Sequence, residues 1–187
     1  MTVEQAQAIL YGMAAALDLP VPPELQASLI AGYLHQDQPE PLKNLPVEAG
    51  ASAYLAALAL KQVDPSQWLT QLFTFIEGRS DALEMVLRRV GHVEGWVDQV
   101  AALQHIARGQ EPAAAQVAQV LYCLRQYPDD YRSAIALALK SEFPSIVALL
   151  VGGISAARLG LAAVAQTKIP ENYEELLKVA QRLAIPR

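Results

Sequence analysis

The sequence predicts an all-α, single-domain protein, a multi-helix orthogonal bundle built from residues 1–187. Apolar residues recur at spacings of three and four along most of the chain, and no segment alternates with period two for long enough to form a strand. Proline, glycine or aspartate separates these apolar segments at short intervals. Alanine supplies much of the 53% hydrophobic content, which favours closely packed helices. A chain of 187 residues also fits one domain with one core.

Proline residues delimit the predicted helices of the N-terminal region. A Thr2–Gln5 capping box opens the first helix, which must stop at the prolines that follow residue 19. A second helix is predicted over 23–34, because proline is well tolerated in a first turn. Residues 35–46, HQDQPEPLKNLP, are predicted to form a proline-rich loop, and an alanine-rich helix follows over 47–61.

Capping residues and glycines delimit the helices of the remaining chain. Asp64 followed by Pro65 indicates an N-cap and a first helical position, and Ser80 or Asp81 indicates another start. We expect Gly91 to end that helix. A separate helix is expected after it, with Trp96 among its inward-facing residues. The expected ranges are 65–77, 81–89, 92–106, 112–127, 129–140, 144–165 and 170–183.

Small residues follow one another along the helix predicted over 144–165. Gly152, Ala156 and Gly160 lie four apart, and Gly153 and Ala157 form a parallel row. Such rows make a shallow groove that lets another helix approach closely. Each interior glycine costs about 1 kcal/mol of helix propensity, so packing has to compensate. We therefore predict that this helix is central, and that Gly153→Leu destabilises the fold.

Composition excludes several classes of function. The net charge of −5 and the lack of a basic stripe argue against nucleic-acid binding. The apolar stretch 144–157 is too short to span a membrane and is followed by Arg158. The N-terminus has no basic region typical of a signal peptide, so we expect a cytoplasmic protein. The single cysteine, Cys123, cannot form an internal disulfide and is expected to be a buried, inert thiol.

Residues 116–187 resemble the C-terminal part of a known family. The likeness lies in Leu121–Cys123, Pro128–Arg132, Gly160–Leu161 and Ile169–Pro170. These segments are similar to those of the ADP-ribosylglycohydrolases. The resemblance implies an all-α fold and, in the family, a dinuclear magnesium or manganese site. It implies that the metal ligands come from a Gly-Asp element, an Asp-Asp-Thr element and a late Asp-x-Asp-Thr motif.

The metal-binding motifs of that family have no counterpart in this sequence. Phe143–Val147 stands where the late motif would be, and the chain has no Gly-Asp dipeptide and no Asp-Asp-Thr. Its only Asp-Asp, Asp129–Asp130, matches a different family position, where we expect helix capping. Hard divalent cations need several oxygen ligands. We therefore predict no catalytic residue, no metal site and no cofactor, and a degenerate family member that binds a protein partner or assembles with itself.

Two other interpretations stay open. The chain could be a divergent, truncated, metal-dependent ADP-ribosyl hydrolase, or an unrelated helical adaptor. Consecutive helix pairs stacked in one direction would favour the adaptor. The hydrolase would be favoured by the convergence of several carboxylates on one pocket, the candidates being Asp81, Glu84, Glu94, Asp98 and Glu142.

Four residues are candidates for contact with a partner. Phe73 and Phe75 lie about 200° apart on a helix, so they cannot both face one core. Phe75 either packs against a neighbouring helix or forms an exposed patch with Arg79. Leu42 and Leu45 belong to the proline-rich loop, where function often lies.

The histidines carry no metal motif in the sequence. His92-x-Glu94 matches half of the zinc-deaminase motif, but the Pro-Cys-x-x-Cys half is absent. We interpret His92 as part of a solvated helix start and His105 as a packed or half-exposed histidine.

Overall fold

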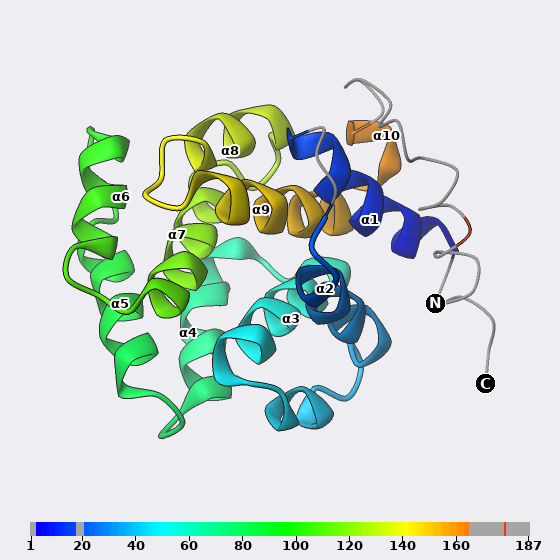
Figure 1. The fold of residues 1–187 in the computed structure, drawn as a ribbon, viewed down its shortest axis with the longest axis horizontal. Coiled ribbons are helices and arrows are strands. Elements are labelled where there is room, and N and C mark those ends of the chain that lie inside the picture. The colour runs from blue at the N-terminus through cyan, green and yellow to red at the C-terminus, as the bar shows by residue number, and fades with distance from the viewer. Residues whose placement is uncertain (1–2, 18–20, 165–177, 179–187) are drawn as a thin grey trace.

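The computed structural model describes residues 3–17, 21–164 and 178, and within them it is entirely helical (Figure 1). This confirms the all-α prediction. Thr2 of the predicted capping box and the helix expected over 170–183 lie outside the described residues. The helices are α1 (Val3–Leu17), α2 (Pro23–Leu34), the 3-10 helix η1 (Glu40–Asn44), α3 (Val47–Leu60), α4 (Pro65–Ile76), α5 (Asp81–His92), α6 (Gln99–Ala107), α7 (Pro112–Gln126), α8 (Tyr131–Ala138), α9 (Pro144–Leu159) and α10 (Leu161–Val164).

The glycine- and alanine-rich helix α9 lies at the centre of the bundle, as predicted. It contacts α1, α2, α3, α7, α8 and α10, and every residue from Val147 to Ala157 is buried. The alanine-rich α3 contacts α9 as well as α2, α4 and α7. In Figure 1, α5 and α6 lie at one edge and run across the direction of α9. The alanine-rich segments therefore supply the close helix contacts of the core.

At their crossing, α1 and α9 are in close contact. A Cβ added to Gly12 would collide with the carbonyl oxygen of Gly152, and a Cβ on Gly152 would collide with that of Gly12. At Gly153 the neighbours are the side chains of Met13 and Leu29. The two helices thus touch backbone to backbone, which only glycine permits at both positions.

Four helices begin with a polar side chain that caps the first turn. Asp64 caps α4, Ser80 caps α5, Asp98 caps α6 and Asp130 caps α8. Each side chain accepts a hydrogen bond from a first-turn backbone N–H that has no partner within its helix. The predicted starts at Asp64 and Ser80 are confirmed, and of the Asp129–Asp130 pair it is Asp130 that caps.

Two of these caps stabilise the protein at neutral pH, and their contribution should be lost in acid. Hydrogen bonds from Ser66 to Asp64, and from Ser133 to Asp130, lower the pKa of each carboxyl. A lowered pKa in the folded state stabilises the fold above the unfolded pKa of about 3.9, and this contribution is lost as the pH falls through the folded value. Asn caps helices as well as Asp does but carries no charge.

We therefore expect the double variant Asp64→Asn/Asp130→Asn to lose less stability than the wild type between about pH 5 and pH 2. Urea unfolding across this range measures it. If the free energies of unfolding of the two proteins fell in parallel with pH, the lowered pKa values of Asp64 and Asp130 would be contradicted.

The expected helix over 92–106 is wrong at its N-terminal end. α5 continues through Gly91 to His92, and α6 starts only at Gln99. Gly91 fits a helix without strain, whereas Gly95 has φ +88°, a conformation that favours glycine and breaks the helix. Trp96, expected to face inward, therefore lies in the connecting turn and is exposed.

Two further boundaries differ from expectation. α9 ends at Leu159 because Gly160 has φ +80°, so the helix does not continue to residue 165. The proline-rich loop contains η1, whose Leu42 is fully buried.

Cys123 lies in the core, as predicted. Burial raises the pKa of its thiol, so the side chain stays neutral and unreactive at physiological pH. Among the residues that the structure describes, none of the helices has both the length and the apolar character needed to cross a membrane.

Candidate functional site

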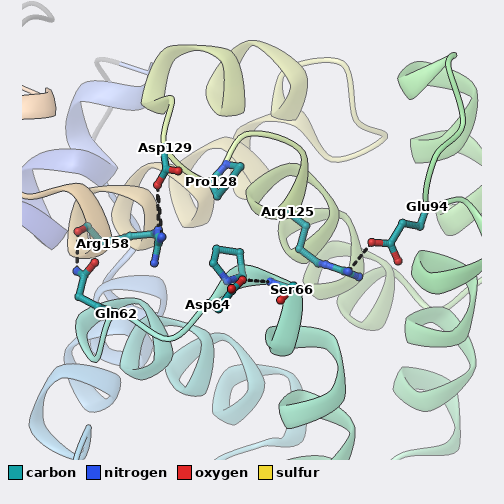
Figure 2. Close-up of a pocket in the computed structure, with 9 residues that line it drawn as sticks. Gln62, Asp64, Ser66, Glu94, Arg125, Pro128, Asp129 and Arg158 are labelled. Atoms are coloured by element: carbon teal, nitrogen blue, oxygen red, sulfur yellow. Dashed lines mark hydrogen bonds and ion pairs between the residues drawn. The ribbon is translucent and has the colours of Figure 1, made fainter.

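A polar cleft of about 560 Å³ opens where the start of α4 meets the C-terminal ends of α7 and α9 (Figure 2). The connector before α4, the turn after α5 and the α7–α8 connector complete its walls. Charged and hydrogen-bonding side chains dominate the lining, which consists of Gln62, Asp64, Pro65, Ser66, Glu94, Arg125, Pro128, Asp129 and Arg158.

Arg158, in the last turn of α9, forms one side of the cleft. Its Nη1 donates to the carbonyl of Val63 at 3.2 Å, and its Nε and Nη2 both lie 3.4 Å from Oδ1 of Asp129. Gln62 donates in turn to the backbone carbonyl of Arg158 at 2.7 Å. The Arg158 side chain is 16% exposed and that of Asp129 is 75% exposed. Arg158 therefore joins three chain segments, while Asp129 is largely solvated.

Arg125 forms the opposite side of the cleft, with the start of α4 between the two arginines in Figure 2. Its Nη2 lies 2.6 Å from Oε1 of Glu94, a short, charge-assisted hydrogen bond. Behind this pair is a small cavity of about 30 Å³, lined also by Tyr122. The Tyr122 hydroxyl is buried and has no hydrogen-bond partner in the described protein. The cavity has room for one water molecule, which would satisfy it.

Every carboxylate that lines the cleft is already engaged. Asp64 accepts from the N–H of Ser66 at 2.9 Å, Glu94 pairs with Arg125, and Asp129 pairs with Arg158. Arg158 also contributes to the lowered pKa of Asp64. Three carboxylates against two guanidinium groups leave the lining nearly neutral. The lining therefore presents polar and charged groups, and its carboxylates do not converge on a cation.

The five carboxylates that would support a hydrolase do not gather at this cleft. All lie in the described part of the chain, and only Glu94 lines the cleft. Asp98 caps α6, and Glu84 accepts from the backbone N–H of Gly78. Over residues 3–17 and 21–164, no three His, Cys, Asp or Glu side chains are placed to hold a metal ion together.

The four candidate partner residues lie close together, but two of them are buried. Arg79 donates to the carbonyls of Lys43 and Leu45 at 2.6 and 3.3 Å, and its guanidinium carbon lies 5.6 Å from the centroid of the Phe75 ring. Phe75 is buried and stacks on Tyr54 with ring centroids 4.4 Å apart.

Phe75 therefore packs against a neighbouring helix, which was one of the two expectations. Leu42 is buried as well, so neither Phe75 nor Leu42 is exposed for contact with a partner. Partner contact through Arg79 and Leu45 stays a prediction.

The turn between α5 and α6 exposes two apolar side chains, and for Trp96 this corrects the expected inward position. Trp96 is 38% exposed and Val97 is 100% exposed. On the neighbouring part of the two helices, Arg89 Nη1 donates to the carbonyls of His105 and Arg108 at 3.0 and 2.8 Å. These hydrogen bonds fix the end of α6 against α5. Glycine at position 95, directly before the tryptophan, and an N-cap aspartate at position 98 were the sequence features that could have identified this turn.

The fold and the cleft define an all-α bundle with an ion-paired polar site. A family model described as ADP-ribosylglycohydrolase matches residues 19–187. The chain therefore belongs to the ADP-ribosylglycohydrolase family. The match extends far upstream of the C-terminal third that carried the resemblance, and it rules out an unrelated helical adaptor. Comparisons with curated proteins and with solved structures give no match.

Proposed function

We propose that this family member is not a hydrolase, and that it works by binding a protein partner or a second copy of itself. The observation that carries the proposal is the exposure of Trp96 and Val97 on a well-fixed turn. Tryptophan is enriched among the residues that dominate binding energy at protein interfaces, and a fully exposed valine beside it adds apolar area.

The turn that presents Trp96 is held on both sides. Asp98 accepts hydrogen bonds from the N–H groups of Val100 and Ala101, and Arg89 ties the far end of α6 to α5. The Trp96 ring also contacts the rings of His92 and His105. An anchor that is ordered before binding loses little conformational entropy on binding, which favours affinity.

The engaged carboxylates of the cleft argue against metal-dependent hydrolysis at the cleft itself. The family's dinuclear site needs carboxylate oxygens that are free to ligate. The cleft carboxylates Glu94 and Asp129 are paired with arginines, and Asp64 caps a helix. The family resemblance places Phe143–Val147 at the position of the Asp-x-Asp-Thr motif, and this segment begins α9 at the end opposite Arg158 of the cleft.

Replacing Trp96 tests the binding role. We expect Trp96→Ala to weaken association by at least about 2 kcal/mol, or roughly 30-fold, because hot-spot aromatic residues contribute this much. Sedimentation of the purified protein measures self-association, and affinity capture from the source cell with wild-type and variant baits measures partner binding.

Leu139→Ala is the matched control, since Leu139 is an exposed apolar residue at the C-cap of α8, outside the α5–α6 turn. A complex that survives Trp96→Ala and Val97→Ser as well as it survives Leu139→Ala would contradict the proposal.

Titration calorimetry with ADP-ribose, in the presence of Mg²⁺ or Mn²⁺, tests the non-catalytic role. We expect no metal-dependent binding heat. Metal-dependent binding, followed by release of ADP-ribose from a modified protein, would instead establish a divergent hydrolase.

A further inference from the structure

Two histidines and a tryptophan form a cluster at the α5–α6 edge of the molecule. His92 is the last residue of α5 and is exposed, and His105 lies on α6 and is partly buried. Their ring centroids are 5.8 Å apart with planes tilted by 38°. The Trp96 ring lies 5.2 Å from that of His105 and 6.1 Å from that of His92. Three residues that are up to 13 positions apart thus meet at one surface site.

We propose that His92 and His105 together bind one divalent transition-metal ion of the Cu²⁺, Ni²⁺ or Zn²⁺ type. A metal–nitrogen distance of about 2.0–2.1 Å places two imidazole centroids on one tetrahedral ion about 5.2 Å apart. The observed separation of 5.8 Å is slightly longer, so a small rotation of one ring brings both nitrogens to a shared ion. His92 is exposed, so its ring can turn toward a shared ion without disturbing the core.

The surroundings leave the two imidazoles available to a metal. In the described structure neither ring has a hydrogen bond to another protein group. The carboxylates nearby in sequence are engaged, because Glu94 pairs with Arg125 and Asp98 caps α6.

The ion would therefore have two protein ligands, and water or a bound partner's side chain would complete its coordination. Imidazole ligands favour Cu²⁺, Ni²⁺ and Zn²⁺, whereas Mg²⁺ and Mn²⁺ prefer oxygen. This site thus differs in chemistry from the family's carboxylate site.

The two helices hold the histidines at this separation. Arg89, one turn before His92 on α5, donates to the carbonyl of His105 itself at 3.0 Å and to that of Arg108 at 2.8 Å. The backbone of one ligand is thereby tied to the helix that carries the other. Because this fixed pair loses little conformational entropy on binding, it should bind an ion more tightly than two flexible side chains would.

Titration of the tag-free, purified protein with NiCl₂, CuCl₂ or ZnCl₂ tests the proposal. We expect one ion per chain by calorimetry, and quenching of Trp96 fluorescence by Cu²⁺ or Ni²⁺. His92→Ala and His105→Ala should each weaken binding by about tenfold or more, because one imidazole alone holds the ion poorly. Circular dichroism and thermal melts confirm that each variant is folded.

Three controls make the outcome decisive. His35→Ala removes the third histidine of the chain and should leave the affinity unchanged. Trp96→Phe should keep the binding heat and lose the quenching, since the other tryptophan, Trp68 on α4, is buried. MgCl₂ should give no heat. The proposal would be overturned if His92→Ala or His105→Ala bound the ion as tightly as the wild type does. It would also be overturned if His35→Ala lost as much affinity as these two variants.

Discussion

Replacing Gly152 with alanine is expected to lower the free energy of unfolding by about 3 kcal/mol, the upper part of the range for overpacking a core. The new Cβ would meet the carbonyl oxygen of Gly12 and lie 2.9 Å from the Cβ of Ala16. Backbone atoms cannot rotate away as a side chain can, so α1 and α9 would have to separate. Urea or guanidinium unfolding of the purified variant measures the loss.

Gly91→Ala is the matched control for this substitution. Gly91 is also a helical glycine, but its added Cβ would meet only Leu69 Cδ2 at an ordinary 3.5 Å. Alanine there should stabilise the protein by roughly 0.5–1 kcal/mol through helix propensity. Gly153→Leu is expected to destabilise by about 1–3 kcal/mol, since Met13 and Leu29 fill the space beside it. Equal stability of Gly152→Ala and Gly91→Ala would refute the backbone contact of α1 with α9.

Arg158→Ala is expected to cost about 2 kcal/mol of stability, because hydrogen bonds to a charged group contribute roughly 1.5–3 kcal/mol. The guanidinium joins the end of α9 to Val63 before α4 and to Asp129 before α8. Its loss removes the link between these segments at one wall of the cleft. Thermal and denaturant unfolding measure the cost.

Asp129→Asn separates the ion pair from the other contacts of Arg158. Asp129 is mostly solvated and its pair with Arg158 is long, so we expect a loss of at most about 0.5 kcal/mol. A loss as large as that of Arg158→Ala would show that the ion pair, and not the Val63 contact, holds the cleft wall.

The polar cleft and the α5–α6 edge meet at the turn after α5, whose Glu94 lines the cleft. Carboxylates pair with guanidinium groups on each side of the cleft, whereas the edge exposes an aromatic and an aliphatic side chain beside two imidazoles. Partner binding and metal binding both concern the edge, but they are measured with different variants, Trp96→Ala for the partner and the two His→Ala changes for the metal. Failure of one proposal therefore leaves the other standing.

Local signals in the sequence predicted most helix boundaries. Asp64–Pro65 and Ser80 were identified as helix starts because capping depends on a few adjacent residues. The failure over 92–98 arose because glycine does not by itself end a helix. Gly91 continues α5, whereas Gly95 adopts positive φ and ends it. The pattern of apolar residues could not tell these two glycines apart.

The cleft could not be predicted from the sequence. Arg158 lies 94 positions after Asp64, and Glu94 lies 31 before Arg125, so no local spacing links them. The His92–His105 pair was missed for the same reason, since each histidine alone looked structural. The buried state of Leu42 likewise depends on how η1 packs against α3.

By itself, the sequence determined the helical class and the central place of the Gly/Ala helix, because periodicity, capping and small-residue spacing are properties of neighbouring residues. Short segments of its C-terminal third also carried the resemblance to the ADP-ribosylglycohydrolases. Only the tertiary structure decided which charged groups neutralise one another, and that Trp96 is exposed while Phe75 is buried. Those outcomes depend on which distant helices meet, and long-range packing places residues together that no local pattern connects.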